Sequence, residues 1–168
     1  MDATVTLCSS SDVMEHTAYI ALGSNLGDRA HYLSETTRLI GDRVGDVLAV
    51  SSPMETEPVG FESEHKFLNQ VLAVRTSLAP RALLTVTREI ERELGRERKS
   101  VGGIHFDRTC DVDILMIDDL VYHDEWLEIP HPRMRERLFV LKPLAEIAPD
   151  VIDPVTGKTI RELLWDVS

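Results

Sequence analysis

At positions 108–116 the chain reads Arg108-Thr109-Cys110-Asp111-Val112-Asp113-Ile114-Leu115-Met116. Apolar and polar residues alternate along this run and branched side chains are frequent, which predicts a β-strand. Successive side chains of a strand point to opposite faces. We therefore expect two sets of residues on opposite faces of this strand: Cys110, Val112, Ile114 and Met116 on one, and Asp111 and Asp113 on the other.

The two aspartates have the spacing of a site for divalent cations. Their Cα atoms would lie roughly 6.5–7 Å apart, two steps of strand rise. Carboxylates at this separation can hold two cations about 3.5–4 Å apart, an arrangement used for in-line phosphoryl displacement. Ligands that are all oxygen favour magnesium over zinc. A lone Asp-x-Asp is more often a polar strand face wetted by solvent, so the choice depends on the rest of the chain.

The composition limits the class of protein. A chain of 168 residues with 43% hydrophobic and 28% charged residues fits one ordinary globular domain. The net charge of −11 argues against a general surface for nucleic acid or anionic membrane, because both need a basic face. Basic residues nevertheless cluster twice, which indicates either bound small anions or solvated faces: Arg96, Arg98, Lys99 and Arg108, then Arg133, Arg135, Arg137 and Lys142.

Cysteine usage and the lack of targeting patterns predict a cytoplasmic protein. Cys8 lies in a polar leader and Cys110 on an apolar strand face, which fits a reducing compartment. Residues Met1–His16 have neither the basic start nor the apolar run of a signal peptide. No stretch approaches the ~18 consecutive apolar residues of a membrane span. We expect a disordered leader over 1–16 and one domain over 17–168.

The predicted elements follow the order strand, helix, strand, strand, helix, strand. Apolar periodicity and turn residues place them as follows: strands at Thr17–Leu22, Val44–Ser52, Phe67–Val74 and the segment around Asp111, with helices at Asp28–Ile40, ended by Gly41, and Pro80–Leu94, ended by Gly95. This order is that of the α+β, ferredoxin-like βαββαβ plan, an antiparallel sheet with both helices on one face. The first and third strands would be central, and the exposed face would carry the aspartates.

Further elements are expected after this unit. Asp118-Asp119 should turn the chain into Leu120-Val121-Tyr122, a hairpin partner of the aspartate strand. Pro130-His131-Pro132 predicts an irregular corner, followed by a short helix from about Arg133. Thr159 should cap a last short helix through Trp165. The full prediction is thus a ferredoxin-like sheet with a C-terminal hairpin and short helices.

A second ligand site is predicted around the third strand. The loop Pro53–Lys66 has roughly a dozen residues, which is long enough to suspect function. In the strand after it, Phe67 and Asn69 should point the same way. An aromatic face beside an amide can hold a flat heterocycle with donor and acceptor edges. The alternative is an aromatic core residue beside a capped turn.

Several motifs occur together in the order and at the spacing of one family. They are Tyr19-Ile20-Ala21-Leu22-Gly23-Ser24-Asn25-Leu26-Gly27; Thr56-Glu57-Pro58-Val59-Gly60 before Phe67-Leu68-Asn69; Gly95-Arg96-x-Arg98-Lys99 before Arg108-Thr109-x-Asp111-x-Asp113-Ile114; and Pro130-His131-Pro132-Arg133-Met134 before Arg137, Phe139-Val140-Leu141 and Pro143-Leu144. From about Tyr19 to Leu164 the chain resembles the hydroxymethyl-dihydropterin pyrophosphokinases of folate biosynthesis. Members of that family move the pyrophosphoryl group of ATP onto a reduced pterin and release AMP.

The resemblance implies a role for each matched position in a single catalytic domain. Its catalytic positions are Arg96, Arg108, Asp111 and Asp113, and the two aspartates would hold two Mg²⁺ ions. The positions that bind the phosphates of ATP are Arg98, Lys99, His131 and Arg137. The pterin would lie between Phe67 and Phe139, read by Asn69 and by the loop around Thr56 and Val59, with Glu91 in the wall of the site. The implied partners are ATP and a reduced pterin. Together with the charge, which argues against nucleic acid and membrane, this leads us to expect a monomer that binds these small molecules.

One segment departs from the family pattern, and three other functions compete. We expect the loop Arg96–Asp107 to close over the site as a lid. Between Lys99 and Arg108 the family usually has Trp-Gly-Pro, whereas this chain has His105-Phe106-Asp107 in a longer loop, which changes the shape of that lid. An RNA-binding module would need a basic sheet face. A phosphodiesterase or nucleotidyltransferase would use the same Asp-x-Asp but not the pairing of Phe67 and Asn69 with Phe139. A zinc site of His105, Cys110, His123 and His131 lacks a short-spaced ligand pair.

Overall fold

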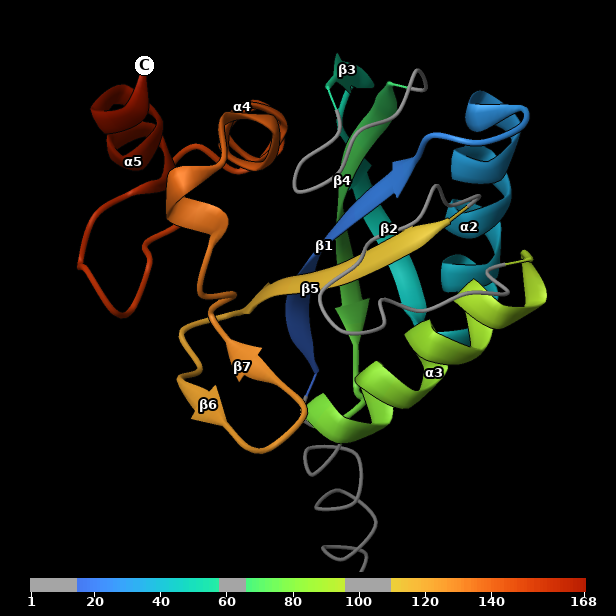
Figure 1. The fold of residues 1–168 in the computed structure, drawn as a ribbon. Helices are drawn as coiled ribbons and strands as arrows, with labels where there is room; N and C mark the ends of the chain where they lie inside the picture. Colours follow the sequence, from blue (N-terminus) through green and yellow to red (C-terminus); the bar gives the residue numbers. More distant parts are fainter. Residues whose placement is uncertain (1–14, 58–65, 96–109) are drawn as a thin grey trace, which may run out of the picture.

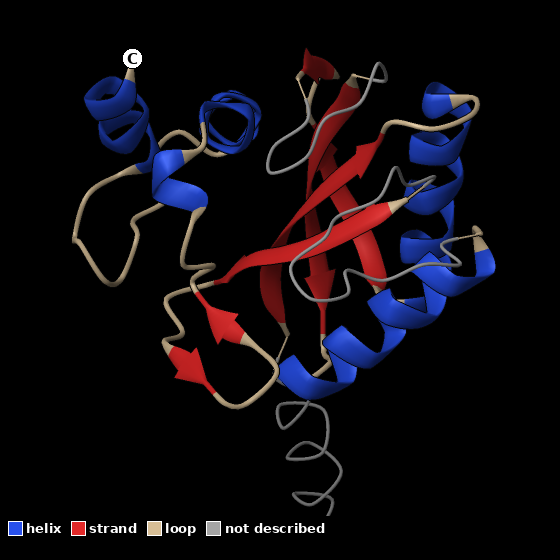
Figure 2. Ribbon diagram, in the orientation of Figure 1, coloured by secondary structure: helices blue, strands red, loops and turns tan. Residues whose placement is uncertain are grey.

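An antiparallel sheet forms the centre of the protein, as Figure 1 and Figure 2 show for a computed structural model that describes residues 15–57, 66–95 and 110–168. Its strand order is β2-β4-β1-β5, with a short strand β3 also paired to β4. The strands are β1 (His16–Ser24), β2 (Gly45–Val50), β3 (Met54–Thr56), β4 (Phe67–Thr76) and β5 (Asp111–Ile117). The first and third predicted strands, β1 and β4, are central, and β5 pairs with β1, so the ferredoxin-like plan is confirmed.

Two helices cover one face of this sheet, as predicted (Figure 1). They are α2 (Arg29–Arg43), capped by the Asp28 side chain, and α3 (Pro80–Glu93), which begins with proline and is followed by Gly95 at φ 96°. Their apolar faces pack on Ile20, Leu22 and Leu72 of the sheet. The predicted end of the first helix at Gly41 is wrong. The backbone N–H of Val44 still donates to Ile40 O at 2.8 Å, so the helix continues for two residues past the glycine.

The opposite face of the sheet is partly covered by C-terminal helices. These are the 3₁₀ turn η1 (Met134–Glu136), α4 (Leu138–Ile147) and α5 (Ile160–Val167). They enclose a second core in which sheet residues meet helix residues: Tyr19, Val71, Ala73, Leu115 and Met116 against Met134, Leu141, Leu144, Ile160 and Leu163. The prediction of an exposed second face is therefore wrong for the part that these helices cover, and Asp111 and Asp113 on the same face are half-buried rather than exposed.

A bulge in β5 changes the predicted faces of that strand. Tyr19 of β1 lies opposite Met116, but the next residue, Ile20, lies opposite Ile114, so Leu115 is an extra residue. Up to Ile114 the alternation is as predicted, and Cys110 and Val112 face the helices. The prediction that Met116 shares their face is wrong, because one extra residue reverses the alternation.

The predicted hairpin has a different partner. Residues Tyr122–His123 (β6) pair with Glu128–Ile129 (β7) in a small separate sheet and not with the aspartate strand. The chain leaves β5 through Asp118 at φ 45°. The β6–β7 turn is closed by Asp124, whose carboxylate accepts the N–H groups of residues 126 and 127 at 2.7 and 2.9 Å.

Several predictions fall on residues that the structure does not describe. They concern residues 1–14 of the leader, most of the loop 53–66, and the lid over 96–107; of the predicted leader, His16 is described and opens β1. The predicted cap of the last helix is confirmed: Thr159 and Glu162 form a reciprocal capping box. Among the described residues, none of the helices is long and apolar enough to cross a membrane.

Candidate active site

Asp111 and Asp113 lie on the side of β5 that faces away from α2 and α3. Both are half-buried, while their neighbours Val112 and Ile114 are buried in the helix-side core. The predicted common face of the two carboxylates is confirmed by this alternation. Burial, followed by the charges of Asp111 and Glu91, raises the pKa of Asp113 to about 7, although Arg88 and Arg137 act in the opposite direction. So much negative charge in a small space favours a bound cation.

Glu91 of α3 holds the backbone between the two aspartates. Its side chain is buried, with 2% of the residue exposed. One carboxylate oxygen accepts the N–H of Val112 at 2.7 Å and the other accepts Nη1 of Arg88 at 2.9 Å. Because Val112 lies between Asp111 and Asp113, this contact fixes the point from which both carboxylates project.

The substitution Glu91→Ala is expected to reduce the free energy of unfolding by about 1–3 kcal/mol, because it leaves the buried N–H of Val112 without this acceptor. Urea denaturation measures the change. Glu89→Ala, an exposed position on the same helix, is the control and should stay within about 0.5 kcal/mol of the parent. Equal stability of the two variants would show that Glu91 does not support β5.

His131 is held beside the aspartates by the bulge of β5. Its backbone N–H donates to Leu115 O at 2.8 Å, the carbonyl of the extra residue. The ring Nδ1 accepts the N–H of Arg133 at 3.1 Å, so the proton of the neutral ring lies on Nε2. Burial, Arg137 and Arg133 lower the pKa of His131 to about 4. The ring is therefore neutral at physiological pH and offers Nε2–H as a donor.

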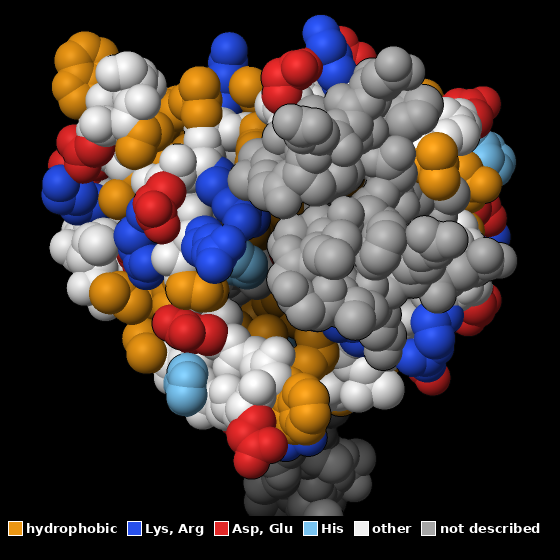
Figure 3. All heavy atoms as spheres, in the orientation of Figure 1, with side chains coloured by type: hydrophobic (Ala, Val, Ile, Leu, Met, Phe, Trp, Pro, Cys, Tyr) orange, Lys and Arg blue, Asp and Glu red, His pale blue; other side chains and the backbone are white. Residues whose placement is uncertain are grey.

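Two arginines lie close to this histidine, Arg137 and Arg133, and both lower its pKa. Figure 3 shows that Lys and Arg side chains gather near the middle of one face of the molecule. The guanidinium carbon of Arg137 also lies 5.5 Å from the centre of the Phe139 ring, a cation–π distance. His131, Arg137 and Phe139 thus form one neighbourhood at the start of α4, where an anion and an aromatic ligand could meet.

Phe67 and Asn69 point the same way, as predicted, and both side chains lie over Gly23. A Cβ atom on Gly23 would lie 3.4 Å from Oδ1 of Asn69 and 3.5 Å from Cδ1 of Phe67. The Asn69 amide nitrogen donates to Met54 O at 3.1 Å and to Thr56 Oγ1 at 2.7 Å. The prediction that Thr56 belongs to a loop is wrong: Met54–Thr56 adds strand β3 to β4, and this strand fixes the Asn69 amide.

Gly23 links the two predicted sites across three strands. In the register of the sheet it lies opposite Asn69 on one side and Asp111 on the other. Cross-strand partners share a face and adjacent strands are about 4.8 Å apart, so Asn69 and Asp111 lie on the order of 10 Å apart. The residue between them has no side chain. The sheet therefore provides a flat floor between an amide and a carboxylate.

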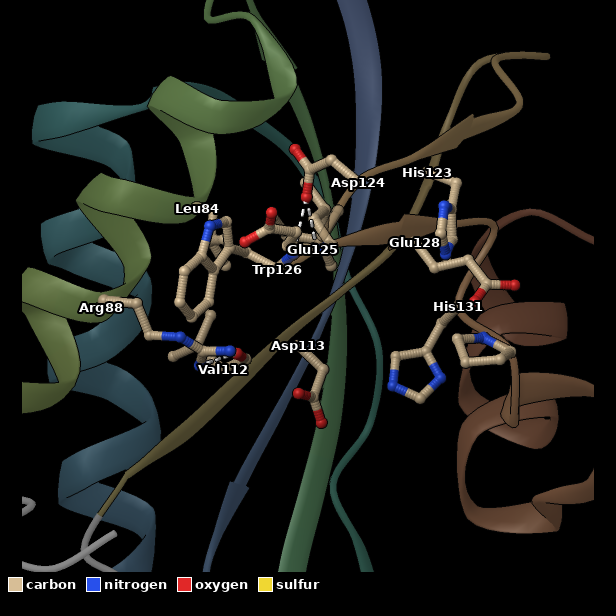
Figure 4. A pocket seen from close by; sticks show the side chains of 13 residues that line it. Leu84, Arg88, Val112, Asp113, His123, Asp124, Glu125, Trp126, Glu128 and His131 are labelled. Carbon is tan, nitrogen blue, oxygen red and sulfur yellow. Dashed lines mark hydrogen bonds between the residues drawn. The ribbon is translucent and has the colours of Figure 1, made fainter.

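A pocket of about 340 Å³ lies on the other side of the aspartates, between α3, β5 and the β6–β7 hairpin. Its walls include Leu84, Ile114 and Trp126. Figure 4 shows Leu84 and Trp126 at one end, and Asp113 and His131 near the other. Sequence reasoning missed this pocket because the pocket forms only when the β6–β7 hairpin folds back toward α3. No local sequence pattern predicts that tertiary contact.

The zinc alternative has no support in the described residues. Cys110 faces α2, where its sulfur lies 3.2 Å from Thr36 Oγ1, and His123 is on β6. No three His, Cys, Asp or Glu side chains of the described part of the chain form a metal-ligand group. A cation held by Asp111 and Asp113 would need further oxygen atoms from a ligand, as magnesium commonly takes from phosphates.

The other predicted site residues lie outside the described ranges: Val59, Arg96, Arg98, Lys99 and Arg108.

A buried ion pair anchors the segment that carries His131 and Arg137. Arg135 of η1 donates to both carboxylate oxygens of Asp153, at 2.5 and 3.0 Å. Asp153 is 0% exposed and also accepts the N–H of Val155 and the hydroxyl of Thr156. Burial raises the pKa of Asp153, but these partners outweigh it and the net pKa is lowered.

Asp153→Ala is expected to lower the free energy of unfolding by about 3 kcal/mol, because it leaves Arg135 without its buried partner. Since the pKa of Asp153 is lowered in the folded state, this contribution is present above the unfolded pKa and is lost as the pH falls. Chemical denaturation at pH 7 measures the loss. Asp150→Ala removes an exposed pair with Arg161 and should cost at most about 1 kcal/mol. A loss no larger than that of Asp150→Ala would contradict the anchoring role.

The chain is similar in sequence and in fold to known proteins. Residues 19–149 match the family model described as 7,8-dihydro-6-hydroxymethylpterin-pyrophosphokinase (HPPK). Two proteins named 2-amino-4-hydroxy-6-hydroxymethyldihydropteridine pyrophosphokinase are similar: one from Porphyromonas gingivalis, 50% identical over 133 residues (78% of this chain, 90% of that protein), and one from Bacillus subtilis, 49% identical over 145 residues (86% and 85%). A solved Plasmodium falciparum HPPK-DHPS triple mutant with SDX-DHP has a similar fold, with a TM-score of 0.75 at 18% identity. That match covers 95% of this chain and 46% of the longer one.

Proposed function

Since the chain belongs to the 7,8-dihydro-6-hydroxymethylpterin-pyrophosphokinase family, and is thus a pyrophosphokinase, we propose that it transfers the pyrophosphoryl group of ATP to the hydroxymethyl group of 6-hydroxymethyl-7,8-dihydropterin and releases AMP. One observation carries the proposal. Asp111 lies next to the flat floor at Gly23, and Asp113, two residues further along β5, lines a pocket that reaches His131. Such an arrangement suits two substrates that meet at a pair of carboxylates.

Asp111 and Asp113 are the residues that would hold two Mg²⁺ ions. Their fit rests on the donor set: both ligands are carboxylates, and the pKa of Asp113 is raised first by burial and then by the charges of Asp111 and Glu91, so a bound cation would stabilise its charged form. Bound magnesium would neutralise phosphate charge and make the substrate hydroxyl more acidic. Glu91 supports this site through the backbone of Val112 without facing the ligand.

The nucleotide would place its base and ribose in the pocket and its phosphates toward Asp113 and His131. A volume of about 340 Å³ is at the lower end of the range of small-molecule sites, which suits part of a nucleotide. The Nε2–H of neutral His131 and the guanidinium of Arg137 are suitable phosphate donors. Family resemblance adds Arg98 and Lys99 for the phosphates, and Arg96 and Arg108 for the transferred group.

The pterin would lie on the floor at Gly23. Asn69, with its amide fixed by Met54 and Thr56, would read the edge of the ring. Phe67 would cover one face of the ring, and Phe139 of α4, together with Val59, would complete the site. The register of the sheet then directs the opposite end of the ligand, with its hydroxymethyl group, toward Asp111.

The chemistry then depends on positioning. The hydroxymethyl oxygen attacks the β-phosphorus of ATP, the bond from this phosphorus to the α–β bridging oxygen breaks, and AMP leaves. Holding the two substrates in line and stabilising the developing charge provides most of the acceleration. An enzyme nucleophile is not required, and Cys110 faces the helices. A monomer in the cytoplasm, without nucleic-acid or membrane partners, remains a prediction from the sequence.

The test is the dependence of nucleotide turnover on the pterin. The protein is incubated with ATP and magnesium, with and without 6-hydroxymethyl-7,8-dihydropterin, and the nucleotides are separated by ion-exchange chromatography. We expect AMP only when the pterin is present, and none when EDTA removes the metal. ATP hydrolysis that does not depend on the pterin would contradict the proposed function.

A further inference from the structure

Trp126 is a large apolar side chain that the fold does not bury. It lies in the β6–β7 turn with 67% of its surface exposed, and it lines the pocket. Figure 4 shows its indole next to Leu84 of α3, at the end of the pocket away from His131. Exposed tryptophan beside a concave site is typical of residues that contact a ligand.

The backbone of this turn is held in place although the indole is exposed. The Asp124 carboxylate accepts the N–H groups of Trp126 and Leu127 at 2.7 and 2.9 Å, and it accepts the hydroxyl of Tyr122 through its other oxygen. Arg81 of α3 lies 3.7 Å from the same carboxylate. The backbone from which the indole projects is therefore fixed, which lowers the entropy cost of ordering this turn around a ligand.

The chemistry of the pocket differs between its two ends. Near Trp126 the walls are apolar, with Leu84 and Val112, and the nearby charges are the carboxylates of Asp124 and Glu125. Arg88 also reaches this end, but its guanidinium is paired with Glu91. Asp124 is likewise paired with Arg81, so among the described residues Glu125 is the remaining carboxylate at this end, whereas His131 and Arg137 provide phosphate donors at the other end. The end that contains Trp126 therefore suits the base of a nucleotide better than its phosphates.

We propose that Trp126 determines nucleotide specificity: its indole stacks on the base and favours purines, whose larger π-face gives more contact than a pyrimidine. The inference rests on the proposed function, because it assigns the base of the ATP that the function requires. Trp126 takes no part in the transfer itself. Its loss should weaken nucleotide binding while leaving kcat at saturating ATP within about 3-fold of the parent.

Fluorescence can measure this contact without turnover. The chain has two tryptophans, and Trp165 on α5 is 82% exposed and does not line the pocket, so Trp165→Phe leaves Trp126 as the only indole. Titration of this protein with α,β-methylene-ATP and magnesium should change the emission in a saturable way. In the full chain, Trp126→Ala should raise the dissociation constant of this analogue about 10-fold by calorimetry, whereas Trp126→Phe, which keeps a ring, should recover most of the affinity. Trp165→Ala is the matched control and should bind as the parent does.

Two comparisons separate stacking from a general effect. Inorganic triphosphate has no base, so Trp126→Ala should not change its affinity, and the preference of the parent for ATP over CTP in KM should shrink in the variant. Unchanged affinity of Trp126→Ala for the ATP analogue, or an equal loss for triphosphate, would overturn the proposal. Pterin-dependent release of AMP by the parent, measured in parallel, shows whether such a failure belongs to Trp126 or to the proposed function.

Discussion

Asp113→Asn is expected to lower kcat by on the order of 10³-fold and, at the same time, to make the metal-free protein more stable above pH 7. Loss of one ligand of a cation that neutralises transferring phosphate removes about 4 kcal/mol of transition-state stabilisation. Asp111→Asn should be similarly inactive. The two measurements are steady-state kinetics with saturating ATP, pterin and magnesium, and urea denaturation in EDTA.

The gain in stability follows from the sign of the pKa shift. Burial and the neighbouring carboxylates raise the pKa of Asp113 to about 7, so the folded protein binds a proton more tightly than the unfolded chain. The native state of the metal-free parent is therefore favoured below the unfolded pKa and loses this advantage as the pH rises to about 7. Asparagine carries no charge, and one pKa unit corresponds to about 1.4 kcal/mol, so a pKa raised from 3.8 to about 7 predicts that at pH 8 the variant is more stable by about 4 kcal/mol.

A nearby aspartate provides the control. Asp119→Asn changes an exposed carboxylate in the turn after β5 and should leave both kcat and the pH dependence of stability unchanged. The assignment of Asp113 would be contradicted if Asp113→Asn kept near-normal activity. It would also be contradicted if the stability of the metal-free variant still fell between pH 4 and pH 7 as in the parent.

Asn69→Ala is expected to raise the KM for the pterin by roughly 30-fold while leaving the KM for ATP within about 2-fold. The variant loses the amide that reads the ring, and hydrogen bonds of this kind are worth about 1–3 kcal/mol when a buried partner is left unpaired. It also loses the contacts to Met54 and Thr56 that attach β3 to the site. In the proposed function ATP occupies the pocket across β5, and Asn69 does not line that pocket.

The control for Asn69 is the next amide along the strand. Gln70→Ala removes a bond from Nε2 to Ser51 O at 2.8 Å, away from Gly23. It should affect stability more than either KM. Isothermal titration with the pterin and with α,β-methylene-ATP gives the two affinities separately. Equal losses for both ligands in Asn69→Ala would mean that the residue supports the fold and does not read the pterin.

The sequence was sufficient for the plan of the fold because that plan depends on local patterns. Alternation predicted the strand of Asp111 and Asp113 and their common face, and the same rule placed Phe67 and Asn69 together. Proline at the start of α3 and Gly95 after it marked that helix correctly. The order of these elements then led to the sheet order, with β1 and β4 at the centre.

The parts that failed depend on tertiary structure. The bulge at Leu115 interrupts an apolar run, so nothing in the alternation shows that Met116 changes face or that a carbonyl becomes available to His131. Glycine is typical of helix ends, but α2 continues past Gly41 because the N–H of Val44 still donates to the carbonyl of Ile40. Strand β3 and the pairing of β6 with β7 are too short to recognise from pattern, and the pocket depends on that pairing.

The most direct test of the account is the identity of the bond that breaks in ATP. Phosphorus-31 NMR of a reaction with magnesium and 6-hydroxymethyl-7,8-dihydropterin distinguishes the products without separation. The account predicts AMP together with two coupled resonances of a pterin diphosphate, formed in equal amounts. ADP with a single uncoupled resonance of a pterin monophosphate would mean attack on the γ-phosphorus and would contradict the proposed transfer.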